Sequence, residues 1–277
     1  MTAATTAPST GAGAFPADRF HVTFSHALRT EWIKFRSLRS TVWTLAITVV
    51  VMVGFAAMFA AIARSEYNNG NLDDVSGFTS TDVVTVGVSF AQLAIAVLGV
   101  LIVTNEYSTG MIRSTFSVVP RRVPAVLAKA LLITVATFVV SAVAMALSVL
   151  VASPLVSGTP AALDLGDGTT VRVLVGSCLY LSMIALLSLG VGTLLRNTAG
   201  SIFTLVALLL VLPGILSSVP PQWIRTIAEY MPSTGGSEIM LASSGTGLTP
   251  WQGFGVLVVW AVVPLLGALV VVRRRDV

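Results

Sequence analysis

Six apolar runs, each about twenty residues long, dominate the hydrophobic pattern of this chain. Helices of this length cross the roughly 30 Å hydrocarbon core of a bilayer, and a helix satisfies its own backbone hydrogen bonds in lipid. The runs lack the alternation of apolar and polar residues that is typical of a transmembrane β-barrel. The pattern therefore predicts an all-α integral membrane protein with spans near residues 42–63, 83–104, 130–152, 173–195, 199–219 and 251–272.

Residues 19–41, which precede the first span, have an amphipathic rather than a uniformly apolar pattern. Apolar side chains recur every three or four residues from Phe20 to Leu38, where Trp32 or Glu31 occupies one place in the series, and basic side chains lie among or opposite them. An amphipathic basic helix with aromatic anchors is typical of the membrane interface. The polar and anchoring residues of this predicted interfacial helix are Arg29, Glu31, Trp32, Lys34, Arg36 and Arg39.

The remaining segments are polar or irregular. Residues 1–18 are rich in Ala, Thr, Ser, Gly and Pro without an apolar period, which predicts a disordered tail and no signal peptide. In residues 220–250 we expect short helices that rest on the outer leaflet. Pro213 and Pro264 predict kinks in the fifth and sixth spans. Small residues four apart, such as Ala56 and Ala60 or Ser188 and Gly192, favour close helix packing.

Basic residues fall mainly on one side of the predicted spans. With the N-terminus inside, the outer segments hold three bases, Arg64, Arg172 and Arg225, and the outer loops are otherwise acidic. Because cytoplasmic loops carry the excess of Lys and Arg, this distribution predicts that both termini are cytoplasmic. The inner bases are Arg29, Lys34, Arg36, Arg39, Arg113, Arg121, Arg122, Lys129, Arg196, Arg273, Arg274 and Arg275.

Composition agrees with a membrane protein. Of the 277 residues, 55% are hydrophobic and 10% are charged, whereas a soluble domain carries about 25% charged residues. The formal net charge of +4 does not indicate a nucleic-acid partner, because the bases flank apolar spans as anchors do. The single cysteine, Cys178, provides neither an internal disulfide nor the spacing of a metal or haem site. We expect a multi-pass protein of the plasma membrane.

The sequence carries no catalytic motif. It has no G-x-x-x-x-G-K-[ST] loop for ATP and no H-E-x-x-H helix for zinc, and both histidines precede the first span. No predicted span contains His, Asp or Glu, and Lys129 and Arg172 lie at span ends, where long bases reach the interface. We therefore predict no enzyme and no cofactor in this chain. Active transport by such a protein requires energy from outside the membrane.

The longest polar interruption on the predicted inner side runs from Asn105 to Lys129. Thr109-Gly110 predicts a turn, residues 111–119 a short helix that lies flat, and Pro120 and Pro124 a restart into the third span. A short, partly apolar helix between two spans is a suitable surface for a soluble partner. An ordinary basic loop that only sets topology is the alternative.

This loop resembles the one between the second and third spans of ABC-2 type permeases, the membrane subunits of ABC exporters. The shared pattern is E-Y-x-T-G-x-x-R from Glu106, then P-x-R from Pro120, then Lys129. The run A-L-R-x-E-W-x-K-x-R from Ala27 also resembles the helix that precedes their first span. The resemblance covers Ala27 to Val277 and is loose in the outer loop. It implies that residues 19–277 are one six-helix permease domain.

What the resemblance implies is an exporter subunit without its own ATPase site, which works with a cytoplasmic ABC ATPase that binds ATP and Mg²⁺. A second permease subunit, identical or similar, completes the assembly, and the cargo is lipid-like, amphiphilic or drug-like. The alternative is a non-transporting anchor or sensor that recruits a partner through the same loop. The implied contacts to the ATPase are Glu106, Tyr107, Thr109, Gly110, Met111, Ile112, Arg113, Phe116, Pro120 and Arg122.

Overall fold

The computed structural model describes residues 24–70, 79–108, 122–219, 221–243 and 245–274. The described residues form helices joined by turns, and six spans among them are long and apolar enough to cross a membrane. The predicted all-α membrane fold is thereby confirmed. The helices are α1 (Phe24–Ser37), α2 (Arg39–Asn68), α4 (Asp82–Ser108), α6 (Arg122–Val156), α7 (Gly168–Leu195), α8 (Thr198–Val206), the π-helix η1 (Ala207–Val211), α9 (Leu212–Ser218), α10 (Gln222–Glu229), α11 (Pro232–Ser237), the 3-10 helix η2 (Glu238–Met240) and α12 (Pro250–Arg274).

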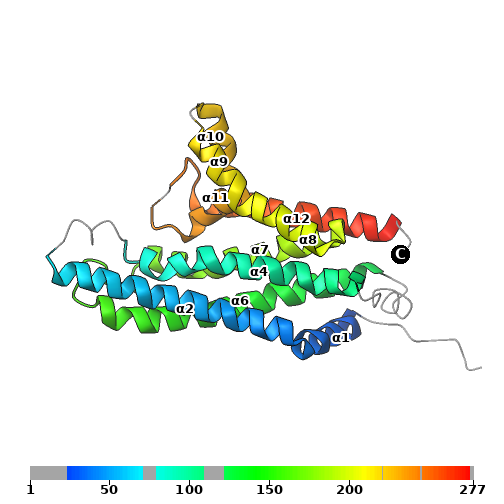
Figure 1. Cartoon of the computed structure of the whole chain (residues 1–277), viewed down its shortest axis with the longest axis horizontal. Coiled ribbons are helices and arrows are strands. Elements are labelled where there is room, and N and C mark those ends of the chain that lie inside the picture. Colours follow the sequence, from blue (N-terminus) through cyan, green and yellow to red (C-terminus); the bar gives the residue numbers. More distant parts are fainter. Residues whose placement is uncertain (1–23, 71–78, 109–121, 220, 244, 275–277) are drawn as a thin grey trace, which may run out of the picture.

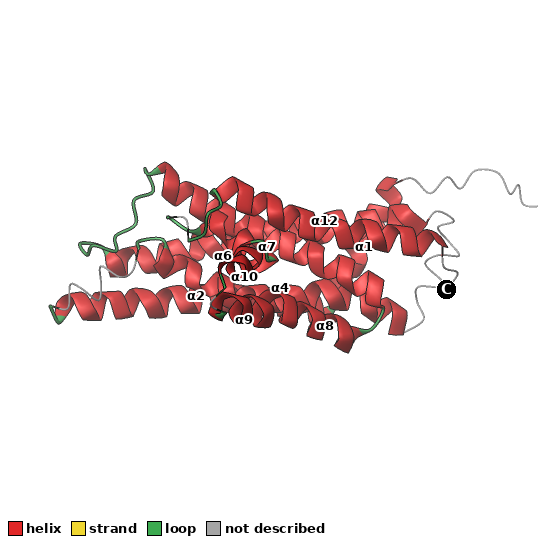
Figure 2. Cartoon of the chain, turned by 90° about the horizontal axis from the view of Figure 1, so that it is seen from above, coloured by secondary structure: helices red, strands yellow, loops and turns green. Residues whose placement is uncertain are grey.

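The long helices run side by side in an elongated bundle. Figure 1 shows α2, α4, α6, α7 and α12 along the long axis, with α8 and α9 inclined across them. One end of the bundle holds α1, the starts of α2, α6 and α8, and the C-terminal ends of α4, α7 and α12. We call it the basic end, because it carries Arg29, Lys34, Arg36, Lys129 and Arg196, among other bases. The opposite end is the far end; Figure 2 shows the same bundle from above.

Five of the six candidate spans are longer than predicted, and the fifth, Thr198–Ser218, is shifted by one residue. The first span, expected at residues 42–63, is Arg39–Asn68, and the third, expected at 130–152, is Val123–Val156. Hydropathy identifies only the part of a helix that crosses the hydrocarbon core. The helix itself continues beyond the core, where polar side chains can be solvated. The interfacial helix α1 ends at Ser37 because Leu38 adopts an extended conformation between α1 and α2.

The two prolines act differently. Pro213 follows the π-helical turn η1, so the fifth span has the predicted irregularity. Pro264 lies inside the continuous helix α12. The helix α7 passes this proline at Gly190, where a methyl group would lie 3.1 Å from the carbonyl carbon of Pro264 and 2.9 Å from the nitrogen of Leu265.

Helix α7 forms the centre of the bundle. Within its most apolar window, 72% of residues are buried, against 22% in α2, and it packs against α4, α6 and α12. Small residues allow this close packing: Gly99 of α4 lies against Ser188, and Gly192 lies against Val100. In α2, Ala56 and Ala60 are both fully buried. The predicted pairs Ala56–Ala60 and Ser188–Gly192 thus face the bundle, whereas in the predicted pair Ala57–Ala61 the second residue is exposed.

The buried polar groups of the bundle are satisfied locally or in pairs. Most Ser and Thr hydroxyls donate to the carbonyl one turn earlier, as Ser188 does to Ile184 at 2.6 Å. Gln92 is a buried amide of α4. Its Oε1 accepts a hydrogen bond from the Tyr180 hydroxyl at 2.5 Å, and its Nε2 donates to the carbonyl of Ser89. Gln92 therefore joins α4 to α7 and serves packing.

The segment after α9 differs in part from the predicted short helices on the outer leaflet. Helix α10 is mostly exposed, but α11 and η2 pack into the bundle against α12 and α7. Arg172, expected to reach the interface, instead donates to the carbonyls of Ile239, Leu241 and Ala242 at 3.0–3.4 Å. A part-buried guanidinium is stabilised by such acceptors, and these hydrogen bonds fix η2 to the start of α7.

The close approach of α4 and α7 predicts a sharp effect of side-chain volume at Gly99. In Gly99→Ala, the added methyl group would lie 2.6 Å from Cβ of Ser188 and 2.8 Å from the carbonyl oxygen of Ala185. Overpacking of this kind costs about 1–3 kcal/mol. We expect a lower unfolding temperature of the detergent-solubilised chain. Gly54→Ala is the matched control, because nothing lies within 4 Å of its added methyl group.

Equal unfolding temperatures for the two alanine variants would contradict this packing of α4 on α7.

Candidate functional site

The interfacial helix α1 presents a charged face to the bundle. Glu31 is 6% exposed and Lys34 is half-buried, whereas Trp32 and Ile33 are exposed on the other side. The apolar period of this helix left Trp32 and Glu31 as alternatives, and the structure places Glu31 inward. Because α1 packs mainly on α6, its inward carboxylate faces the first turns of that helix.

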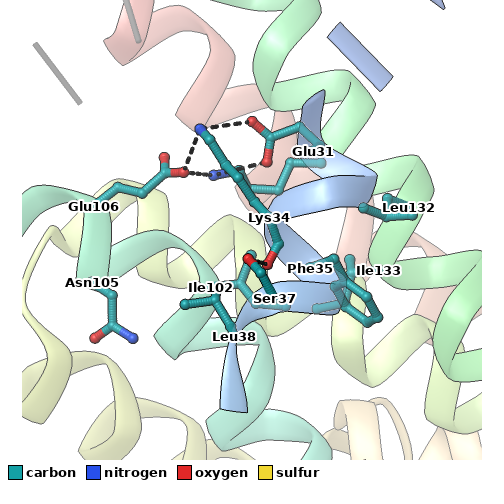
Figure 3. A pocket seen from close by; sticks show the side chains of 11 residues that line it. Glu31, Lys34, Phe35, Ser37, Leu38, Ile102, Asn105, Glu106, Leu132 and Ile133 are labelled. Carbon is teal, nitrogen blue, oxygen red and sulfur yellow. Dashed lines mark hydrogen bonds and ion pairs between the residues drawn. The ribbon is translucent and has the colours of Figure 1, made fainter. Parts of the chain in front are cut away.

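Four charged side chains from three helices meet there, as Figure 3 shows. Lys129 of α6 lies 2.7 Å from Glu106 of α4 and 3.4 Å from Glu31 of α1. Lys34 of α1 lies 3.3 Å from each of the same two carboxylates. We call Glu31, Lys34, Glu106 and Lys129 the charge cluster. Each ammonium group contacts both carboxylates, so the cluster is a closed ring of alternating charge.

The charges of this ring balance. Two carboxylates face two ammonium groups, and the side chains of Glu31 and Lys129 are only 7% and 9% exposed. Moving a charge out of water is costly unless it is paired, and here every member has two partners of opposite sign. Lys129, which is predicted to lie at a span end, directs its Nζ to the carboxylates of Glu106 and Glu31.

The ring keeps Lys34 protonated. Burial acts to lower the pKa of this ammonium group, but the carboxylates of Glu106 and then Glu31 outweigh burial and raise the pKa above its ordinary value. A raised lysine pKa stabilises the folded state below the ordinary lysine pKa of about 10.4, and this stabilisation is lost as pH rises through the folded-state value. The ion pairs of Lys34 therefore persist throughout the physiological range.

A second contact lies beside the cluster. The guanidinium of Arg196 lies over the ring of Tyr107, 5.2 Å from its centroid. Arg196 ends α7 in a left-handed conformation with φ 53°, and Asn197 caps α8 by accepting from the amide of Gly200 at 2.8 Å. The last turn of α4 is thus held by α1 and α6 through Glu106 and by the α7–α8 junction through Tyr107.

A cavity of about 320 Å³ adjoins the cluster. Its polar wall is the cluster together with Asn105 and Ser37, and its apolar wall is formed by side chains of α1, α4, α6 and the α1–α2 junction (Figure 3). The apolar residues are Phe35, Leu38, Ile102, Leu132 and Ile133. The arrangement combines balanced charges with a hydrophobic surface at the basic end.

The structure brings together part of the predicted site. Glu106 pairs with Lys34, a base of the interfacial helix, and Arg113 lies outside the described residues. Arg29, Arg36 and Arg39 are exposed. Arg122 begins α6, and its side chain is not described. The predicted contacts that lie outside the described residues are Thr109, Gly110, Met111, Ile112, Arg113, Phe116 and Pro120.

Sequence reasoning missed two members of this site. Lys129 was assigned to the membrane interface, and Arg196 counted only as a basic residue of an inner loop. A usable signal was present, because a lysine at the eighth position of an otherwise apolar helix requires a carboxylate partner. Glu106, at the end of the preceding span, was the nearest acidic residue before it in the sequence.

The comparison with known families now adds to this geometry. The model of the ABC-2 family transporter proteins matches residues 27–220, well over half of the chain. The chain belongs to this family. The match includes all four residues of the charge cluster, and it confirms the resemblance seen in the interfacial helix and in the loop after Glu106. No curated protein matches the sequence.

The balance of the charge cluster predicts the effect of removing Lys129 in this ABC-2 transporter protein. Lys129→Met keeps an unbranched stem of similar length but leaves two carboxylates facing Lys34 alone. Breaking a buried ion pair on one side costs about 3–5 kcal/mol, so we expect a markedly lower unfolding temperature. The neutral double variant Glu106→Gln/Lys129→Met should recover most of the loss, because Glu31 and Lys34 still pair.

Arg36→Met serves as the control, since Arg36 is an exposed base on the same end of the bundle. If the single and double variants lose equal stability, Lys129 acts through packing and the charge-balance argument fails.

Proposed function

We propose that this ABC-2 family transporter protein is the membrane-spanning subunit of an ATP-driven exporter. A separate cytoplasmic ABC ATPase supplies the energy, and a second permease subunit, identical or similar, completes the translocation path. The family membership supports a transporter, and the absence of a P-loop motif in the sequence supports a separate ATPase. The cargo is amphiphilic, lipid-like or drug-like.

The observation that carries this proposal is the position of the charge cluster relative to the loop after α4. Glu106 lies two residues before the end of α4, and Lys129 lies in the second turn of α6. Their 2.7 Å contact joins the two helix ends that flank residues 109–121, and the contact of Lys34 with Glu106 joins α1 to the end of α4. A force applied to this loop by a soluble partner reaches three helices at once.

The interior of the bundle supports an external energy source. The charged groups of α4 and α6 nearest the bundle interior, Glu106 and Lys129, are already paired with each other. Gln92, deeper in α4, is hydrogen-bonded to Tyr180. Carriers driven by protons or sodium place ionisable residues on the ion path. The groups found here are engaged in structural contacts, which favours an exporter powered through its loops.

The positive-inside rule assigns the basic end to the cytoplasm, and labelling of single cysteines tests this orientation. In a Cys178→Ser background, Ser243→Cys lies exposed at the far end and Ala199→Cys lies exposed at the basic end. We expect an impermeant thiol reagent to modify the first variant in intact cells and the second only after permeabilisation. The reverse labelling pattern would place the basic end outside.

Coupling to the ATPase is tested at Phe116, the aromatic residue of the loop. Loss of an aromatic anchor typically costs an interface about 2 kcal/mol or more, which is over tenfold in affinity. We expect Phe116→Ala to reach the membrane and to lose the ATPase on co-purification. Phe90→Ala is the matched control, because Phe90 is an exposed aromatic residue that stacks on Phe55 in the far half of α4.

Retention of the ATPase at the wild-type level by Phe116→Ala would mean that the loop serves only as a topology signal. ATP hydrolysis by this chain, purified without any partner, would refute the separate ATPase.

A further inference from the structure

The cavity beside the charge cluster is lined by both charged and apolar side chains. On one side are the ammonium groups of Lys34 and Lys129 and the carboxylates of Glu31 and Glu106. On the other side are apolar side chains of α4 and α6, among them Ile102. A cavity of about 320 Å³ is at the lower end of the range for ligand pockets. Its surface matches a molecule with a charged head and an apolar chain.

The depth of the cavity indicates where such a molecule would come from. Glu106 is the last residue but one of the candidate span Asp82–Tyr107, and Lys129 lies near the start of the span Val123–Val156. The cluster is therefore at the level where lipid head groups meet hydrocarbon. The apolar residues Leu132 and Ile133 follow Lys129 along α6 toward the bundle interior, which is the direction that an acyl chain takes.

The charge balance selects the kind of head group. The cluster has no net charge, so an anionic head group would bring an unpaired negative charge beside two carboxylates, which is unfavourable at a partly buried site. A zwitterionic head group adds no net charge. Its phosphate can be attracted by the ammonium groups of Lys34 and Lys129, and its cation can face the carboxylates.

The acceptor side favours a primary ammonium group. Both ion pairs of Glu106 fall on Oε1, and among the side chains drawn in Figure 3 its other oxygen makes no contact. A primary ammonium group can donate a hydrogen bond to that oxygen, whereas a quaternary one cannot. Quaternary ammonium groups are recognised by cages of aromatic residues, and Phe35 is the aromatic side chain among the described lining residues.

We propose that this cavity binds one zwitterionic phospholipid with an ethanolamine head group, taken from the leaflet at the basic end. The phosphate lies against Lys34 and Lys129, the ammonium lies against Glu106 and Glu31, and the upper part of one acyl chain lies against Ile102 and the apolar residues of α6. This lipid stays bound in the cavity and fills the space between α1, α4 and α6. It is a structural lipid, so its binding does not depend on transport.

The test uses the full chain, purified in detergent and stripped of lipid. It is offered phosphatidylethanolamine and phosphatidylglycerol with the same two oleoyl chains, and native mass spectrometry counts the lipids retained. We expect one retained phosphatidylethanolamine per chain and at least a tenfold preference over phosphatidylglycerol. Glycerophosphoethanolamine, which has the head group without chains, should not displace it at the same concentration. Equal retention of the two lipids would overturn the proposal, as would displacement by the chain-free head group.

Two variants assign the retained lipid to this cavity. Ile102→Trp fills the apolar wall while the cluster stays intact, and it should abolish retention; Ile47→Trp, at an exposed position of α2, is the matched control and should retain the lipid. Glu106→Gln gives the cluster a net charge of +1, and the preference should shift toward phosphatidylglycerol. Unchanged retention in Ile102→Trp would place the lipid elsewhere. If Ile102→Trp does not fold, the head-group preference of Glu106→Gln decides: an unchanged preference overturns the proposal.

Discussion

Buried charge must be neutralised by its neighbours, and at the basic end of this protein one ring of four charges meets that requirement for three helices. Lys129 is 7% exposed in an otherwise apolar helix, and its contacts with Glu106 and Glu31 make its burial possible. Displacing α4 or α6 would leave one charge of the cluster without a partner in a low-dielectric environment, and displacing α1 would break the contacts of Lys34 with Glu106 and of Glu31 with Lys129. These helices are therefore fixed relative to one another by electrostatics, although α1 buries few apolar side chains of its own.

The middle of the bundle depends on a different constraint, the distance between backbones. There is little hydrophobic driving force between helices in lipid, so close contact and hydrogen bonds replace it. Helix α7 meets α4 at Gly99 and Ser188 and meets α12 at Gly190 and Pro264, where no side chain separates the backbones. The hydrogen bond between Gln92 and Tyr180 adds a polar link between α4 and α7. The rigid centre is thus made by small residues, and the charged groups gather at the ends.

This division explains which features were predictable from the sequence. The six spans were predictable because the hydrophobicity of each run reflects its own lipid environment. The ends of most helices were not, because the helices continue into polar surroundings, as α6 does at Arg122. The pairing of Glu106 with the interfacial helix was also predictable, because the charges of both segments had to lie on the same side. The burial of Lys129 and the packing of α11 against α7 were not, since each depends on partners from segments distant in the chain. Arg172 shows the same limit: its three acceptors lie 67 to 70 residues away.

The charge cluster also bears on how a transporter of this kind could respond to its partner. The cluster has no net charge. If its four side chains move together, no net charge is therefore moved across the membrane interface. The contact of Lys129 with Glu106, at 2.7 Å, is within the range of a strong charge-assisted hydrogen bond. The other three contacts of the cluster are 3.3–3.4 Å long, which leaves room for small rearrangements. The tight pair joins α4 to α6, the two helices that flank residues 109–121, and the looser pairs join them to α1. Under the proposed function, a push on that segment would therefore move α4 and α6 as one body and shift α1 against it, and the cavity between them would change shape first.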